Sequence, residues 1–306
     1  MFTLRQYLLA LLDSRGLTRT LGEIDVCRDE QGRPCFSAGN SAAVFRIRLG
    51  GRIRSLRCYL RPMRHLKEIY GQRLLEKELY LHTSPETGVW VDTVLGDWIE
   101  GSTLHETVAQ AAALRDRESL QILVRLFDRL ALALVTDDRA HGDLKPENII
   151  VGDDGTLCPI DFDASYLPAF AGEISPELGT AAYQHPARTA ANFDERIDDY
   201  PAALISTALH ALAENPTLWD RYGSSDGLLY TPQRIASDPA YRETLALFEK
   251  RGMAVQYRIA QLLTAPTLRL FGLAELLAEA VREKPAARSG TETETPELFV
   301  ENGRWG

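Results

Sequence analysis

Two kinds of hydrophobic pattern divide the chain. Residues 34–60 alternate β-favouring side chains around Gly50-Gly51, which predicts a β-hairpin. A second strand-rich run covers residues 88–101 and ends at a glycine. Between the two runs, the apolar positions from Leu66 to Leu81 fit a helical stripe, so we predict a helix there. The opening residues 1–16 are typical of an amphipathic helix rather than a signal peptide.

Beyond Gly101 the pattern becomes mostly helical. Residues 119–135 and 197–213 are strongly apolar with helical spacing, and the sequence predicts further helix from about residue 240. Residues 284–297 are rich in Pro, Thr and Glu and read as a linker. We therefore expect an α+β chain with a hinge near residues 97–101. Its predicted parts are an N-terminal helical extension (1–30), a small strand-rich lobe (31–96), a larger helical lobe (97–283) and a linker with the C-terminal residues (284–306).

Composition narrows the function classes. The 306 residues suit one large domain or two lobes. A net charge of −9 argues against a general nucleic-acid or membrane-surface binder, and no run approaches the roughly 20 apolar residues of a membrane helix. The four cysteines are scattered without metal-ligand spacing, so we expect a reduced, cytoplasmic setting.

Candidate chemistry is concentrated in residues 141–161. Asp143, Lys145 and Asn148 lie within six positions, directly before the β-like run Ile149-Ile150-Val151. Thirteen residues after Asn148, Asp161 ends another short strand. Two strands that each end in an oxygen ligand can converge on one divalent ion between phosphates. Phosphoryl transfer needs such ligands, a carboxylate to orient the attacking hydroxyl and a cation on the moving phosphate.

The string HGDLKPENIIV followed by IDFD resembles the catalytic loop and metal-binding motif of bacterial eukaryotic-like serine/threonine protein kinases. The resemblance implies a bilobal protein-kinase-like fold that uses ATP and Mg²⁺ or Mn²⁺. It makes Asp143 the catalytic base and places Lys145 on the transferring phosphate. It makes Asn148 and Asp161 the metal ligands. The alternative is that both aspartates merely end strands and cap turns.

Flanking motifs agree with this resemblance. The run LGD, ending at Asp97, and the following WIEGSTL are similar to the hinge that faces the adenine. GTAAYQHP resembles the end of a kinase activation segment, whose threonine, matched by Thr180, bridges the catalytic aspartate and lysine. Asp198 matches the buried aspartate that braces the catalytic loop. An ordinary helix N-cap is the alternative for Asp198, and both roles can hold.

The sequence departs from the protein-kinase pattern at two places that should position the nucleotide. The glycine-rich loop is reduced to Ser37–Val44, in which Gly39 and Val44 keep their places. Arg57 stands where a phosphate-binding lysine is expected, and arginine is bulkier and forked. The helical glutamate that should pair with this cation is matched by Glu76, with Glu78 as runner-up. The alternative for Glu76 is a solvated helix face.

Gly142 replaces an arginine that, in many kinases, pairs with a phosphorylated activation loop. We therefore expect activity that does not need phosphorylation of Ser165, Ser175 or Thr180. The triplet His-Gly-Asp also resembles small-molecule phosphotransferases of the aminoglycoside type, whereas Lys145 favours the protein kinase branch.

The expected function is ATP-dependent phosphoryl transfer to Ser or Thr of a protein substrate, with no nucleic-acid or membrane partner and the oligomeric state left open. A small-molecule kinase and a pseudokinase scaffold are the alternatives. The last residues, Phe299–Gly306, resemble the opening of a WG repeat.

Overall fold

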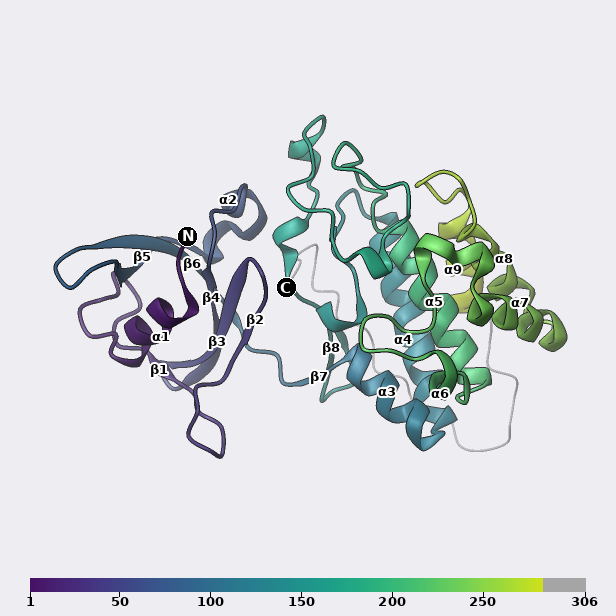
Figure 1. Ribbon diagram of the computed structural model, residues 1–306, viewed down its shortest axis with the longest axis horizontal. Coiled ribbons are helices and arrows are strands. Elements are labelled where there is room, and N and C mark those ends of the chain that lie inside the picture. The colour runs from purple at the N-terminus through teal and green to yellow at the C-terminus, as the bar shows by residue number, and fades with distance from the viewer. Residues whose placement is uncertain (283–306) are drawn as a thin grey trace. The chain divides into compact units, whose positions relative to one another are not determined.

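The computed structural model describes residues 1–282 and divides the chain into two compact units, Met1–Ile99 and a second that begins at Glu100 (Figure 1). The predicted linker and the WG-like residues lie outside the described residues. An antiparallel sheet forms the first unit and helices dominate the second, so the predicted α+β, kinase-like fold class is confirmed.

An antiparallel sheet is the frame of the first unit. Its strand order is β1-β3-β4-β6-β5, and β2 also pairs with β3. Leu49 pairs with Arg52 across a turn in which Gly50 and Gly51 both have positive φ, as a two-residue hairpin turn requires, so the predicted hairpin is confirmed. The elements are α1 (Leu4–Leu12), β1 (Asp25–Val26), β2 (Phe36–Ala38), β3 (Ala42–Leu49), β4 (Arg52–Tyr59), α2 (Leu66–Tyr70), β5 (Leu74–His82) and β6 (Gly88–Asp97).

Helix α1 packs against β5 and closes the core of this unit. Thr3 and Gln6 form a capping box at its first turn, and this satisfies backbone donors that have no partner within the helix. Tyr7 is fully buried among Phe45 and other sheet residues, and its hydroxyl donates to the Tyr59 carbonyl at 2.6 Å. The predicted amphipathic helix is therefore present and contributes to the sheet's core.

The helix predicted from Leu66 to Leu81 is wrong. Only α2 is helical, a 3-10 turn follows at Gly71–Arg73, and the remaining residues form β5. Gly71 adopts a positive φ of 53°, which ends the helix. From Leu79 onward the burial alternates with period two, because Leu79 and Leu81 face the core while Tyr80 and His82 lie on the other face of the strand. The apolar positions between Leu66 and Leu81 fit the helical spacing as well as the alternation of a strand, so their pattern alone did not distinguish the two.

Helices make up most of the second unit. A three-stranded sheet, in the order β7-β8-β9, accompanies them. The elements are β7 (Gly101–Thr103), α3 (Leu104–Leu114), α4 (Arg117–Thr136), β8 (Ile149–Gly152), β9 (Leu157–Pro159), α5 (Asp199–Glu214), α6 (Leu218–Tyr222), α7 (Pro239–Arg251), α8 (Ala254–Leu262) and α9 (Leu273–Arg282), with 3-10 turns at Pro146–Asn148, Phe162–Ala164, Pro168–Phe170, Ala181–Tyr183 and Pro232–Ser237.

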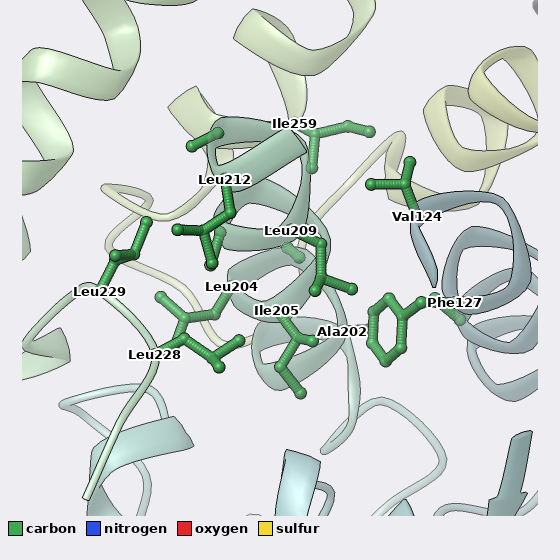
Figure 2. Close-up of a cluster of buried hydrophobic side chains, with 14 of the residues drawn as sticks. Val124, Phe127, Ala202, Leu204, Ile205, Leu209, Leu212, Leu228, Leu229 and Ile259 are labelled. Carbon is green, nitrogen blue, oxygen red and sulfur yellow. The ribbon is translucent and has the colours of Figure 1, made fainter. Parts of the chain in front are cut away.

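The core of the second unit lies between α4 and α5, which are the two strongly apolar helices predicted from sequence. Figure 2 shows Val124 and Phe127 of α4 turned towards Leu209 of α5. Helix α5 is buried along nearly its whole length, so its position is fixed by packing on several sides. Within residues 1–282 we find no helix with the length and hydropathy needed to cross a membrane.

Asp199, in the first turn of α5, is a mostly buried carboxyl group. Its Oδ2 accepts a hydrogen bond from the Leu270 N–H at 3.2 Å, whereas Oδ1 has no partner among the described residues. Burial raises the pKa of Asp199 to about 7, because removal from water penalises the charged form more than the Leu270 N–H stabilises it. The carboxyl group is therefore protonated in the folded protein under mildly acidic conditions.

We expect the free energy of unfolding to decrease as the pH rises from about 4 to about 7. In this window the unfolded chain releases the Asp199 proton and the folded chain retains it. Asp199→Asn should remove the effect, shrinking the loss of stability between pH 5 and pH 8 by roughly 2–3 kcal/mol. Urea unfolding at both pH values measures this difference. An unchanged pH dependence would mean that Asp199 is ionised throughout.

Candidate active site

The loop that carries the predicted catalytic residues is held by Asp198. Its carboxylate accepts hydrogen bonds from the backbone N–H of His141 and, at 3.0 Å, from that of Gly142. Asp198 is only 1% exposed, and its side chain does not cap α5. Burial raises the pKa of Asp198, opposed by the charges of His141 and Arg188 and by both N–H donors. The sequence left two roles for Asp198, an N-cap of the helix and a brace for the loop. The hydrogen bonds of its side chain are those of a brace.

Asp143 is surrounded by the residues that the sequence analysis grouped with it. Its Oδ1 accepts the backbone N–H of Thr180 at 2.6 Å. Its Oδ2 lies 3.4 Å from Lys145 Nζ and 3.2 Å from Asn148 Nδ2. Lys145 Nζ also donates to Thr180 Oγ1 at 2.9 Å, so threonine, lysine and aspartate form a closed set of contacts. These side chains converge although Thr180 is 37 residues from Asp143.

The β8–β9 pair brings Asn148 and Asp161 to the same end of two neighbouring strands. Asn148 closes the 3-10 turn before β8, and its carbonyl accepts the Ile160 N–H at 2.9 Å. Asp161 follows and adopts a left-handed φ of 69°, a conformation that aspartate tolerates better than most residues. Asn148 Nδ2 donates to the Asp143 carbonyl at 2.9 Å as well as to its side chain. The amide nitrogen therefore faces Asp143, which leaves Oδ1 as the branch able to bind a cation.

His141 lies buried beneath this end of the hairpin. Its Nε2 is 2.8 Å from the Ile160 carbonyl oxygen, and its ring packs on Phe162 with the centroids 5.0 Å apart. Nδ1 accepts the backbone N–H of Asp143 at 3.3 Å. His141 thus contacts both the loop that carries Asp143 and the segment that carries Asp161. Among residues 1–282, no group of three or more His, Cys, Asp and Glu side chains could hold a metal ion.

The first unit places most of the predicted nucleotide-binding residues on or beside three adjacent strands. Val44 of β3 and Arg57 of β4 are direct partners across the strand pair. Gly39 lies in the turn between β2 and β3, where its N–H donates to the Ala42 carbonyl at 2.9 Å. Asp97 ends β6 with an exposed carboxylate 3.3 Å from Arg54 Nε.

Glu76 is not on a helix, and its predicted helical position is wrong because β5 replaces the helix. Its Oε1 is 3.1 Å from Lys67 Nζ, and both side chains are mostly exposed. Glu78, the runner-up, is buried and serves the fold. Its Oε1 accepts the backbone N–H groups of residues 19–21 at 2.8 to 3.1 Å, and Oε2 accepts the Thr20 hydroxyl.

The sequence analysis missed Arg188. Its Nη1 donates to the Gly142 carbonyl at 3.0 Å and also to Gln184 Oε1. An arginine just after the motif ending at Pro186 was visible in the sequence. However, no spacing rule connects it with a backbone carbonyl 46 residues away.

Gly142 has a positive φ of 82°, and a Cβ atom added there would lie 2.1 Å from the Ala164 carbonyl oxygen. Gly155, in the turn after β8, has nearly the same φ of 81° but open space where a Cβ would project. The two glycines therefore separate the cost of a left-handed backbone from the cost of a clash.

We expect Gly155→Ala to cost about 1–2 kcal/mol, the usual penalty of an alanine in the left-handed region. Gly142→Ala should cost clearly more, because a backbone atom must move to admit the methyl group. Thermal unfolding of both variants beside the wild type checks the order. Equal losses of stability would show that the loop adapts to a side chain at residue 142.

Comparison with known proteins agrees with this geometry. Serine/threonine-protein kinase PknL of Mycobacterium tuberculosis is 28% identical over 219 residues, which cover 66% of this chain and 52% of that protein. CBL-interacting protein kinase 17 of Oryza sativa subsp. japonica is 28% identical over 172 residues, covering 53% of this chain and 35% of the relative. Serine/threonine-protein kinase chk1 of Schizosaccharomyces pombe is 25% identical over 160 residues, covering 51% and 31%.

The aligned region thus spans about a third to a half of these relatives' lengths. No protein-family model matches the chain. The kinase motifs, assembled as described above, and the similarities to these serine/threonine kinases support a protein-kinase-like family for this chain.

Proposed function

We propose that the protein is a kinase that transfers the γ-phosphate of ATP to a Ser or Thr hydroxyl of a protein substrate. The observation that carries the proposal is the environment of Asp143. Its two carboxylate oxygens are held by the Thr180 N–H, the Asn148 amide and Lys145, so the side chain has one defined direction. A carboxylate fixed in this way suits the orientation of an attacking hydroxyl.

The proposed reaction divides the work among these residues. Asp143 accepts a hydrogen bond from the acceptor hydroxyl and takes its proton as the new oxygen–phosphorus bond forms. The bond between the γ-phosphorus and the bridging oxygen breaks, and ADP leaves. Lys145, 3.4 Å from Asp143 Oδ2, provides a positive charge beside the moving phosphate. When bound, ATP supplies the phosphate and a divalent ion neutralises its charge.

The oxygen donors available fit a magnesium ion that arrives with nucleotide. Asn148 offers Oδ1, and Asp161 offers a carboxylate at the same end of the β8–β9 pair. Mg²⁺ in phosphoryl-transfer sites is usually bound by one or two protein ligands together with substrate phosphates and water.

We expect nucleotide binding to depend on Mg²⁺ or Mn²⁺, and Asp161→Ala to abolish that dependence. Titration calorimetry with ATP, with and without excess chelator, measures it in both proteins. Asp163→Ala is less suitable as a control because Asp163 is buried, whereas Asp153 in the exposed turn after β8 is suitable. Asp153→Ala should behave as the wild type. Equally tight ATP binding with chelator and in Asp161→Ala would contradict the metal assignment.

Nucleotide positioning is assigned to the first unit. We propose that Gly39, Val44, Arg57 and Asp97 contact ATP, with Arg57 in place of the usual lysine. The pairing of Val44 with Arg57 across β3 and β4 supports this assignment, because directly opposed residues project on the same face of a sheet. Arginine keeps its charge, although its forked group does not reproduce an ammonium ion. This substitution and the reduced glycine-rich loop are the two features that suggest the pseudokinase alternative.

The protein acceptor is supported by Lys145 and by the relatives named above, whereas the His-Gly-Asp triplet is shared with small-molecule phosphotransferases. Lys145 contacts Thr180 of the segment that resembles a kinase activation segment. We propose that the reaction takes place in the cytoplasm, because all four cysteines are free thiols and the cytoplasm keeps thiols reduced.

We propose that activity needs no phosphorylation of the segment between Asp161 and Thr180. Ser165 is buried, with its hydroxyl donating to the His141 carbonyl at 3.3 Å. Ser175 is also buried, with its hydroxyl donating to the Glu177 carbonyl at 2.5 Å. Both serines already have acceptors within the fold.

Asp143→Asn should lower phosphoryl transfer by at least about 100-fold, the scale of a positioned general base. The assay follows γ-labelled ATP with a panel of protein and small-molecule acceptors, and Asp153→Asn serves as the control. Transfer to proteins alone supports the proposal, and transfer to small acceptors alone supports the aminoglycoside-type alternative. Wild-type transfer no greater than that of Asp143→Asn across the panel would favour the pseudokinase.

A further inference from the structure

Arg188 is a buried cation directly beneath the catalytic loop. Arg188 is only 9% exposed, and its Nη1 donates to the Gly142 carbonyl at 3.0 Å. Nε and Nη2 have no hydrogen-bond partner among the described residues. Burial lowers the pKa of the Arg188 guanidinium, while the carboxylates of Asp198, Asp143 and Asp194 oppose this shift. The charge is therefore retained in the interior by nearby carboxylates.

The Gly142 carbonyl belongs to the peptide group that joins Gly142 to Asp143. The N–H of that same peptide group donates to His141 Nδ1 at 3.3 Å. Arg188 and His141 thus hold opposite edges of one peptide plane. The orientation of this plane sets the backbone at Asp143, and with it the direction in which the carboxylate leaves the loop.

Arg188 also connects the loop to the segment that carries Thr180. Its Nη1 donates to Gln184 Oε1. A Cβ atom added at Gly179 would lie 2.7 Å from both the Gly142 oxygen and Gln184 Nε2, so residue 179 packs closely on this contact. The adjacent Thr180 N–H is the donor to Asp143 Oδ1. One guanidinium group therefore contacts both parts of the chain that orient Asp143.

An arginine could not occupy residue 142 in this backbone. The left-handed φ, together with an Ala164 carbonyl oxygen only 2.1 Å from where a Cβ would project, means that the backbone would have to shift before any side chain could be placed there. A cation that pairs with the loop must consequently come from elsewhere in the chain, and Arg188 approaches from beneath it.

We propose that Arg188 is a positioning residue for phosphoryl transfer: by holding the Gly142 carbonyl and Gln184 together, it sets the direction of Asp143 without a phosphorylated residue. The role of Asp143 in this inference rests on the proposed function. The contact of Arg188 with the loop does not depend on that function, and it can be tested without measuring phosphoryl transfer.

Arg188→Met should lower kcat by about 10- to 100-fold, because an unpaired buried acceptor is left on the loop. The KM for ATP should change by less than about twofold, since the proposed nucleotide contacts are elsewhere. Arg188→Lys should recover part of kcat because it retains one donor. Arg196→Met is the matched control: Arg196 Nη1 also donates to a backbone carbonyl, that of Val135, outside the catalytic loop. This control should lose stability but keep kcat.

Amide hydrogen exchange without nucleotide gives a second readout. Arg188→Met should exchange faster than Arg196→Met in peptides that cover Gly142, Asp143 and Thr180. A kcat that follows thermal stability equally in both variants, or unchanged exchange in these peptides, would overturn the role of Arg188. If the wild type shows no transfer that depends on Asp143, the proposed function fails, and the exchange data alone decide whether Arg188 orients the loop.

Discussion

The buried carboxylate of Asp198 is the contact on which the rest of the site depends. A carboxylate removed from water is costly unless donors surround it, and Asp198 accepts from two backbone N–H groups of the loop that carries Asp143. Because Asp198 directly precedes α5, those bonds connect the loop to a helix that is packed on several sides. The loop has no helical or strand ladder of its own between Ala140 and Lys145, so its shape depends on side chains, and Asp198 holds two of its backbone N–H groups.

Lys145 Nζ lies 3.4 Å from Asp143 Oδ2, and in an interior of low polarity the removal of either side chain would leave its neighbour uncompensated. Asp143 is further held by the Thr180 N–H and the Asn148 amide, so its carboxylate has few positions available.

Sequence reasoning succeeded where local chemistry decides the outcome. The hairpin of β3 and β4 followed from a Gly-Gly turn between alternating residues, and α4 and α5 followed from long apolar stripes. The run from Leu66 to Leu81 failed because a short apolar stretch suits both periodicities and only Gly71 marks the change. Glu76 was then assigned to a helix that does not exist. The residues grouped around Asp143 were accessible through a motif, whereas Arg188 acts on a backbone carbonyl, which leaves no trace in side-chain patterns.

Glu78 has a consequence for the beginning of the chain. Its buried carboxylate takes up the N–H groups of Arg19, Thr20 and Leu21, and Tyr7 fills the adjoining core. A chain shortened to start after residue 30 would leave a charged group in the sheet without donors and a void in place of an aromatic ring. Both defects are among the more destabilising that a protein interior can contain. The first thirty residues therefore belong to the same folding unit as the sheet.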